Sequence, residues 1–315
     1  MENEVNKRKE LQSHVLSFID DDNDANNFQE LTKFICDNNI SKTKIDLQDF
    51  LHLLINIADN HHRGVNFFSK IKQIFNHLLS DIRSFFSDKE ILDKFWQNKN
   101  IILDSIENNS IVVDKDIIKN GHKFQPQFSG SIYNGLNHRK VMSPYFLLIE
   151  YFHSKSINDT QNLNRIKFRV QRSFNLEIEP FQQLCQQGEN HSHICELIRQ
   201  DSLNNFISYV NTSNIKCDST IPYSDFETNK YLQEKSVRLI EYAAFFGSVQ
   251  IFKYLLKNEV EFDSTLLEFA VHGMNTEIIN LVEECIKDEP KLKPKRNIFG
   301  YGFYQQNQLK GPFGA

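Results

Sequence analysis

The sequence predicts an all-α protein in which an N-terminal helical region precedes a short stack of helical repeats. Apolar residues recur every three or four positions over most of the chain, which is the spacing of one helix face. One pattern also occurs twice near the C-terminal end: Ala270 follows Ala243 by 27 residues, and Ile278 follows Ile251 by the same distance. Repeats of this length are typical of solenoids, whose units bury their apolar faces by stacking on their neighbours.

Bulk composition agrees with a folded protein and excludes several classes. The chain has 315 residues, of which 40% are hydrophobic, and its 27 phenylalanines can supply a large core. A net charge of −5 gives no general attraction for nucleic acid. The five cysteines are odd in number and form no C-x-x-C pair, so neither a disulfide framework nor a common zinc spacing is indicated. No apolar run is long enough to span a bilayer and the polar start does not resemble a signal peptide, so we expect a cytoplasmic protein.

Residues 1–178 are expected to form an N-terminal helical domain. Its first helix carries Leu11, Val15, Phe18 and Ile19 on one face. A third helix is expected over residues 45–58, and further helices over 67–86 and 89–116. The expected core of these later helices includes Phe75, Leu78, Leu79, Phe95, Trp96, Ile101, Ile102 and Leu103. Residues 121–140 contain three glycines and no apolar period, which predicts a linker.

Two further helices are predicted after the linker. The pair Ser143-Pro144 is a helix start, because serine favours the cap and proline the first turn. Residues 162–174 form a basic amphipathic helix, in which Arg165, Lys167, Arg169 and Arg172 alternate with apolar residues. This helix either contacts nucleic acid or presents an ordinary solvated face on which long basic side chains extend into water.

Residues 179–288 are expected to hold the repeats, with helix pairs at about 194–210, 237–257 and 264–286. The first pair is a degenerate copy, in which Glu196 matches Glu241 and Phe206 matches Ile251. Residues 217–235 interrupt the series as an insertion. After the last pair, prolines end the helical period, and residues 289–315 are expected to be a flexible basic and aromatic tail.

The repeat pattern has a physical reason. Two small residues in succession, Ala243 and Ala244, let antiparallel helices approach closely. Gly247 can adopt a positive φ where the chain reverses. In the second copy the turn falls at Asn275 and Thr276, and we expect Thr276 to cap the following helix.

The run EYAAFFGSVQIFKYLL resembles the ankyrin repeat, and FAVHGMNTEIINLV resembles the same second half. The usual Thr-Pro-Leu-His opening is absent, and the short period implies that the β-finger is reduced to a loop around residues 258–263. The run GENHSHICELIRQDSLNNFISYVN, with the upstream NIADNHHRGVNFFSKI, is similar to a large group of protist ankyrin-repeat proteins that carry an uncharacterised domain. The resemblance covers most of residues 11–286 and implies an interaction protein with no assigned chemistry, so it gives no catalytic residues to carry over.

In ankyrin-like stacks the two positions after the small pair face outward. Here they are Phe245 and Phe246 and, one unit on, His272 and Gly273. Exposed aromatic residues are good contact residues. The partner-binding candidates are therefore Arg238, Glu241, Phe245, Phe246 and His272. The alternative is that the insertion or the N-terminal helices bury the two phenylalanines.

Other patterns have a simpler interpretation than a functional site. His191, His193 and Cys195, with Cys185 nearby, could suggest zinc, but caps and core explain them. Adjacent His61 and His62 point to different sides of a turn. No metal, cofactor, catalytic residue or small-molecule substrate is expected. Residues 293–296, Lys-Pro-Lys-Arg, are either a nuclear import signal or part of a solvated tail.

The leading functional prediction is a non-catalytic protein–protein interaction scaffold. One alternative is a nucleic-acid or nuclear-associated binding protein that uses the basic helix at 162–174 and the basic tail. Another is an enzyme with an N-terminal site, which no motif supports.

Overall fold

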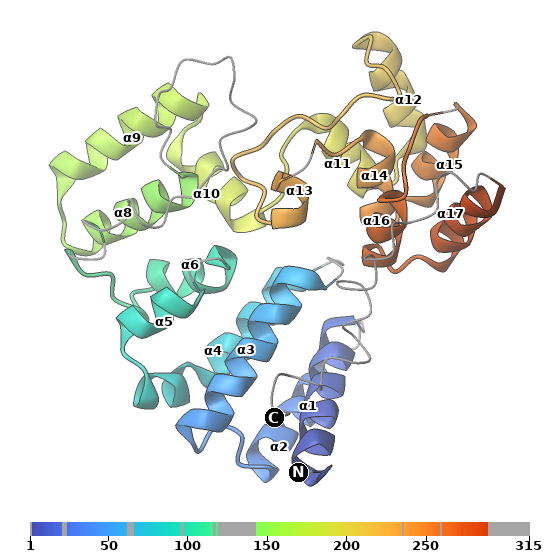
Figure 1. Ribbon diagram of the computed structural model, residues 1–315. Helices are drawn as coiled ribbons and strands as arrows, with labels where there is room; N and C mark the ends of the chain where they lie inside the picture. The colour runs from blue at the N-terminus through green and yellow to red at the C-terminus, as the bar shows by residue number, and fades with distance from the viewer. Residues whose placement is uncertain are drawn as a thin grey trace.

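The computed structural model describes residues 2–20, 24–61, 66–95, 98–115, 118, 143–234, 236–258 and 260–288. Within these ranges all regular secondary structure is helical, apart from one isolated bridge between Thr220 and Arg238. The all-α prediction is therefore confirmed. The helices follow one another along an arc, from α1 at the lower end of Figure 1 through α8–α10 to α17. None of the described helices is both long and apolar enough to cross a lipid bilayer.

The first group of helices packs around one hydrophobic cluster. The four residues predicted to share a face of the first helix, Leu11, Val15, Phe18 and Ile19, are all buried in it. Pro144 begins α8, as the Ser-Pro pair predicts. The helices are α1 Glu2–Asp20, α2 Asp24–Asp37, α3 Lys44–Asn60, α4 Phe67–Phe85, α5 Asp88–Phe95, α6 Lys99–Glu107, α8 Pro144–Ser156, α9 Thr160–Phe174 and α10 Ile178–Gln187.

Several sequence-based predictions lie outside the described residues. They are the core position of Trp96, the structure around His62, the linker at 121–140, the tail from residue 289 onward and the basic cluster at 293–296.

The second group contains three helix pairs. The first helices of the pairs, α11, α14 and α16, pack successively on one another, and α12, α15 and α17 form a second row. The short helix α13 lies in the insertion. The bounds are α11 His193–Arg199, α12 Leu203–Thr212, α13 Lys230–Glu234, α14 Leu239–Phe245, α15 Val249–Lys257, α16 Leu266–His272 and α17 Thr276–Asp288.

Each turn inside a pair contains one residue with positive φ. These residues are Asp201 at 47°, Gly247 at 68° and Met274 at 52°. The Gly247 value confirms the predicted reversal. The same bond recurs in all three turns: the N–H groups of Asp201, Gly247 and Met274 donate to the carbonyls of Ile198, Ala244 and Val271, respectively.

The matching turns correct the alignment of the first pair. Cys195 and Glu241 each lie six residues before the positive-φ residue, so Cys195 stands where Glu196 was expected. By the same rule Phe206 corresponds to Phe252 rather than to Ile251. The reason is that Glu196 points to solvent, whereas Cys195 and Glu241 are both buried.

Small residues lie where the pairs approach most closely, as predicted, and we call this line of small residues the seam. Ala243, Ala244 and Ala270 are each 0% exposed. A Cβ atom on Gly273 would lie 2.1 Å from the Ala244 carbonyl oxygen, so only glycine fits there. Buried Ile251 on the second row contributes roughly 1.5–3 kcal/mol.

The cap of α17 differs from the prediction. The Asn275 side-chain oxygen accepts hydrogen bonds from Glu277 N–H at 3.1 Å and Ile278 N–H at 3.2 Å. Asn275, and not Thr276, therefore satisfies the first free amides of this helix.

In the described chain, buried hydrophobic residues form two clusters. The members up to Cys185 belong to the first cluster and those from Ile194 onward to the second, apart from Phe226. This differs from the expected boundary after residue 178, because Phe181 and Cys185 of α10 are buried in the first cluster. The insertion belongs to both clusters: Phe226 packs in the first and Leu232 in the second. It therefore ties the N-terminal helices to the stacked pairs.

Candidate functional site

The structure separates the predicted partner-binding residues into two groups. Phe245 is 1% exposed and Glu241 is 6% exposed, so neither presents its side chain to a partner. Arg238, Phe246 and His272 are partly exposed. Gly273, which was expected to face outward, is buried against Ala244.

Phe245 is covered by its aromatic neighbours. The His272 ring stacks on it at a centroid distance of 4.2 Å, and the Tyr231 ring lies 6.5 Å away at 19°. Phe246 contacts the same ring at 5.1 Å. Tyr231 belongs to α13, so the insertion buries Phe245, as the alternative interpretation held.

Glu241 acts as a helix cap. Its Oε2 accepts a hydrogen bond from Arg238 N–H at 2.7 Å, and its Oε1 accepts one from Thr265 Oγ1 at 3.3 Å. Burial raises the pKa of this carboxyl group above its ordinary value. The Arg238 guanidinium donates to the Glu261 carbonyl at 2.6 Å. Both residues therefore hold the start of α14 in place.

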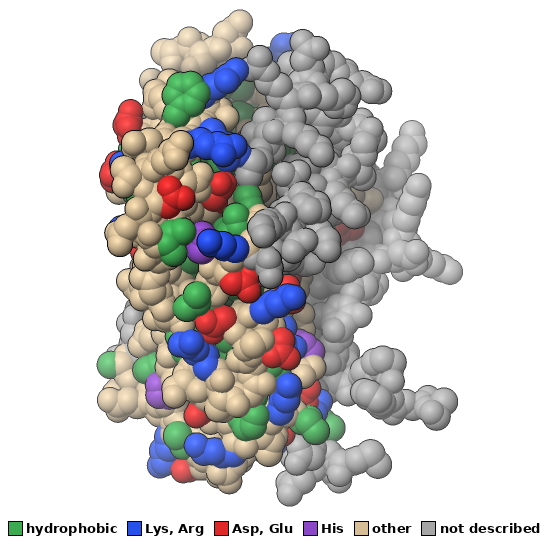
Figure 2. Space-filling model, turned by 90° about the vertical axis from the view of Figure 1, so that its left-hand side faces the viewer, with side chains coloured by type: hydrophobic (Ala, Val, Ile, Leu, Met, Phe, Trp, Pro, Cys, Tyr) green, Lys and Arg blue, Asp and Glu red, His purple; other side chains and the backbone are tan. Residues whose placement is uncertain are grey.

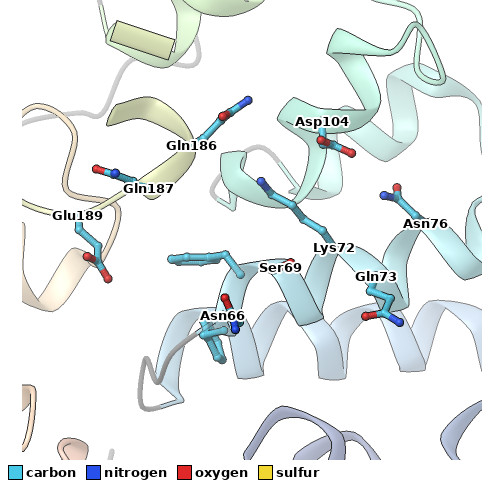
Figure 3. A pocket seen from close by; sticks show the side chains of 11 residues that line it. Asn66, Ser69, Lys72, Gln73, Asn76, Asp104, Gln186, Gln187 and Glu189 are labelled. Carbon is cyan, nitrogen blue, oxygen red and sulfur yellow. The ribbon is translucent and has the colours of Figure 1, made fainter. Parts of the chain in front are cut away.

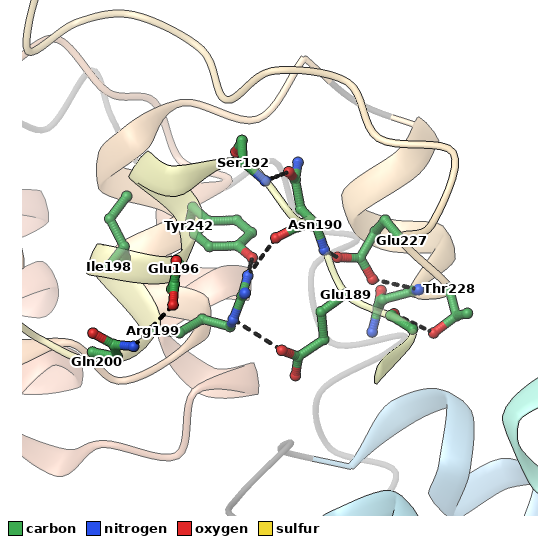
Figure 4. A network of polar contacts seen from close by, with 12 residues as sticks. Glu189, Asn190, Ser192, Glu196, Ile198, Arg199, Gln200, Glu227, Thr228 and Tyr242 are labelled. Carbon is green, nitrogen blue, oxygen red and sulfur yellow. Dashed lines mark hydrogen bonds and ion pairs between the residues drawn. The ribbon is translucent and has the colours of Figure 1, made fainter. Parts of the chain in front are cut away.

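A polar network joins the last turn of α11 to α14 (Figure 4). Arg199 Nη1 donates to the Tyr242 hydroxyl at 2.7 Å and to the Asn190 carbonyl at 2.8 Å. Its Nε lies 2.9 Å from a Glu189 carboxylate oxygen, and its guanidinium lies 5.9 Å from the Phe246 ring centre. The sequence analysis did not predict this network. The one sequence signal for it is the position of Arg199 near a helix C-terminus.

The insertion supplies the other half of this junction. The Tyr145 hydroxyl of α8 donates to the Phe226 carbonyl at 2.6 Å. Buried Glu227 accepts hydrogen bonds from Asn190 N–H at 3.1 Å and Asn229 N–H at 2.8 Å. Glu227 is only 2% exposed, so these bonds satisfy a buried polar group. They also fix the path of the insertion.

The histidine and cysteine residues of this segment have structural roles. His191 Nδ1 lies 2.9 Å from Ser224 Oγ, and burial lowers the pKa of His191. Burial raises the pKa of Cys195 to about 11, which keeps the thiol protonated and unreactive near neutral pH. Among the described residues no group of three or more His, Cys, Asp or Glu side chains is arranged to hold a metal ion.

A polar cavity of about 710 Å³ lies between α4, α6 and the end of α10 (Figure 3). Lys72 extends into it from α4, with Asp104 on one side and Gln186 and Gln187 on the other. Partial burial lowers the pKa of Lys72, and the carboxylates of Asp104 and Glu107 oppose that shift. Its residues come from three distant segments, so no local sequence pattern could have indicated the cavity.

The basic helix α9 presents a further surface. Phe168 is 65% exposed, and Arg165 and Arg172 are exposed on the same side of the helix, three and four residues away. Arg169 is instead paired with Glu150 of α8 at 3.2 Å. Figure 2, which views the side of the molecule that carries α8 and α9, shows basic side chains beside hydrophobic ones toward its upper end.

The comparisons with known proteins are negative: no protein-family model matches the chain, and neither the curated proteins nor the solved structures contain a significant match. The resemblance to ankyrin repeats therefore rests on the residues quoted above.

Proposed function

We propose that the chain is a non-catalytic protein–protein interaction scaffold built on three divergent ankyrin-like helix pairs. The stacking of α11, α14 and α16 in one row and α12, α15 and α17 in another supports this proposal. Stacked helix pairs create an extended surface whose shape does not depend on the exposed residues, so these residues can be used for binding.

The contact surface is an aromatic ridge, defined as Tyr231, Phe246 and His272 around buried Phe245. The single observation that carries it is the continuity of these rings: Phe245 contacts all three, and each of the three is partly exposed. Aromatic side chains that are already held in place lose little conformational entropy on binding, which favours them at protein interfaces.

Affinity capture with the full chain tests this surface. Phe246→Ala should lose the proteins that the wild type recovers, because it removes the most accessible phenylalanine of the ridge while leaving Phe245 in place. Phe168→Ala is the matched control, since it removes an exposed phenylalanine from α9, a different helix. The thermal melting curves of the three proteins establish that all are folded. If Phe246→Ala retains every partner, the ridge is not the contact surface.

A second candidate function is binding of single-stranded nucleic acid through α9. The observation that favours it is the exposed Phe168 ring between Arg165 and Arg172. Bases stack on exposed aromatic rings while arginines neutralise phosphates. The other predicted element, the basic tail, lies outside the described residues.

Titration with a fluorescent single-stranded oligonucleotide at several salt concentrations tests this candidate. Binding through Arg165, Lys167 and Arg172 predicts that the affinity falls with salt, with a log–log slope of roughly −2 at 0.7 per phosphate contact. Phe168→Ala should weaken binding at every salt concentration. A salt-independent signal, or one that Phe168→Ala leaves unchanged, would exclude α9 as the binding surface.

A further inference from the structure

The polar cavity between α4, α6 and α10 has the dimensions of a small-molecule site. Its volume of about 710 Å³ falls within the range of roughly 300–1,000 Å³ that is usual for ligand pockets. Its polar lining consists of a lysine, carboxylates, amides and a serine, and Phe67 and Phe68 also line it. The charged and amide side chains include Lys72, Asn76, Asp104, Gln186, Gln187 and Glu189.

The hydrogen bonds around the cavity orient two of its amides. Asn76 Oδ1 accepts a hydrogen bond from Ser105 Oγ at 3.1 Å, which leaves the Asn76 N–H groups as donors. Gln186 Nε2 donates to Glu107 at 3.2 Å, which leaves the Gln186 oxygen as an acceptor. The wall of the cavity therefore offers both donors and acceptors at defined places.

Lys72 and Asp104 add a charged donor and a charged acceptor. Among the described residues neither side chain makes a direct hydrogen bond or ion pair, although they are close enough to interact electrostatically. A partly buried ammonium group and a carboxylate that do not bond each other both gain from a ligand placed between them.

Most charges around the cavity already have a partner. Glu189 is ion-paired with Arg199 at 2.9 Å, Glu107 accepts hydrogen bonds from Gln182 and Gln186, and Lys72 and Asp104 carry opposite charges. An anion would therefore meet no net positive charge, and Glu107, the one carboxylate in excess, is already bonded to two amides. Hydroxyl groups both donate and accept, so a neutral molecule with several of them can use Lys72, Asp104, Asn76 and Gln186 together.

We propose that this cavity binds a neutral saccharide, whose hydroxyl groups bridge Lys72 and Asp104 and bond the amides of Asn76 and Gln186. The partly buried Phe68 also lines the cavity. Glu189 connects the cavity to Arg199 and thereby to the junction between the two clusters. The cavity shares no lining residue with the aromatic ridge proposed for partner binding.

Saturation-transfer difference NMR on the full chain tests the proposal with glucose, galactose, mannose, N-acetylglucosamine and maltose as probes. At least one of these sugars should show saturation transfer at millimolar concentration. Lys72→Met and Asp104→Asn should each weaken its binding at least about tenfold, because the first leaves a hydroxyl without its partner and the second replaces a charged acceptor with a weaker neutral one. Lys155→Met on α8 and Asp93→Asn on α5 are the matched controls, since both residues are exposed and lie outside the cavity.

Three results would overturn the proposal. The first is that none of the sugars shows saturation transfer with the wild type. The second is that the signal persists unchanged in Lys72→Met and Asp104→Asn. The third is that all four variants, the controls included, lose the signal equally. A thermal shift with inorganic phosphate, measured in parallel, distinguishes a saccharide site from an anion site: stabilisation by phosphate that is lost in Lys72→Met, with no sugar signal, would assign an anion site instead.

Discussion

The N-terminal helices and the stacked helix pairs bury their residues in different ways. α1 and α4 are 19 residues long and pack large side chains such as Phe18 and Phe75 into the first cluster. α14 and α16 have seven residues each, and the second cluster brings them together through alanines and Gly273. The first region depends on large side chains that fill the core, whereas the second also requires small side chains where α14 and α16 approach most closely. Substitutions that add or remove atoms should therefore affect the two regions differently.

The largest effect is expected for Ala243→Glu, which places a charge at a seam position that is 0% exposed. The unpaired carboxylate should destabilise the stacked pairs by more than about 3 kcal/mol. Urea denaturation followed by circular dichroism measures this effect. Asn280→Glu adds the same charge at an exposed position of α17 and should leave the unfolding midpoint unchanged. An unaltered midpoint for Ala243→Glu would show that the helices do not meet at this residue.

Phe75→Ala is the corresponding test of the first region. Phe75 is 0% exposed and packs edge-on against Phe95 at 5.0 Å, so its truncation leaves a cavity. The expected loss of unfolding free energy is about 3–5 kcal/mol. Phe168→Ala, at a position that is 65% exposed, should cost less than about 0.5 kcal/mol in the same urea titration. Equal losses for the two variants would contradict the assignment of the first cluster.

A smaller effect is expected at the contact between two pairs. Asp201 accepts hydrogen bonds from Gln250 N–H and Ile251 N–H, both at 3.0 Å, and thereby caps α15 from the preceding turn. Asp201→Ala should lower the unfolding free energy by about 1–2 kcal/mol. Asp201→Asn keeps an acceptor and tolerates the positive φ, so it should lose less. Exposed Asp218→Ala serves as the control; if it costs as much as Asp201→Ala, the cap contributes nothing specific.

The smallest effect concerns pH. Burial raises the pKa of Glu241 above its ordinary value of 4.5, so the folded protein holds this proton more tightly than the unfolded chain does. Its contribution to stability therefore falls as pH rises from about 4.5 through the raised pKa. Glu241→Gln does not titrate, so wild type should gain stability relative to this variant as pH falls from 7 toward 4.5. Urea midpoints of both proteins at each pH measure the difference; a difference that stays constant would show that the Glu241 pKa is not raised.

Local patterns predicted those parts of the fold that depend on local spacing. The buried face of α1, the start of α8, the helix pairs and the turn at Gly247 all follow from residues within a few positions of one another. The register of the first pair failed by one residue, because Glu196 and Glu241 look equivalent in sequence. The true alignment is fixed by the turn at Asp201, where φ is positive. An aspartate in the sequence does not by itself indicate a positive φ.

The candidate sites were less predictable because distant segments build them. Phe245 is buried by Tyr231, which belongs to an insertion that the repeat pattern does not include. The polar cavity joins Lys72, Asp104 and Gln186 from three helices that are far apart in the sequence. The repeat period contains no information on the contact between Phe245 and Tyr231 or on the cavity, because both depend on how the insertion and α10 pack.

The difference between the two regions is tested most directly by amide hydrogen exchange. Protection is measured segment by segment in wild type, Ala243→Glu and Phe75→Ala. Ala243→Glu should lose protection across α14–α17 and keep it across α1–α6, whereas Phe75→Ala should show the reverse. Full protection of α14 and α16 in Ala243→Glu, or the same loss everywhere in both variants, would contradict a separate seam of small side chains between stacked helix pairs.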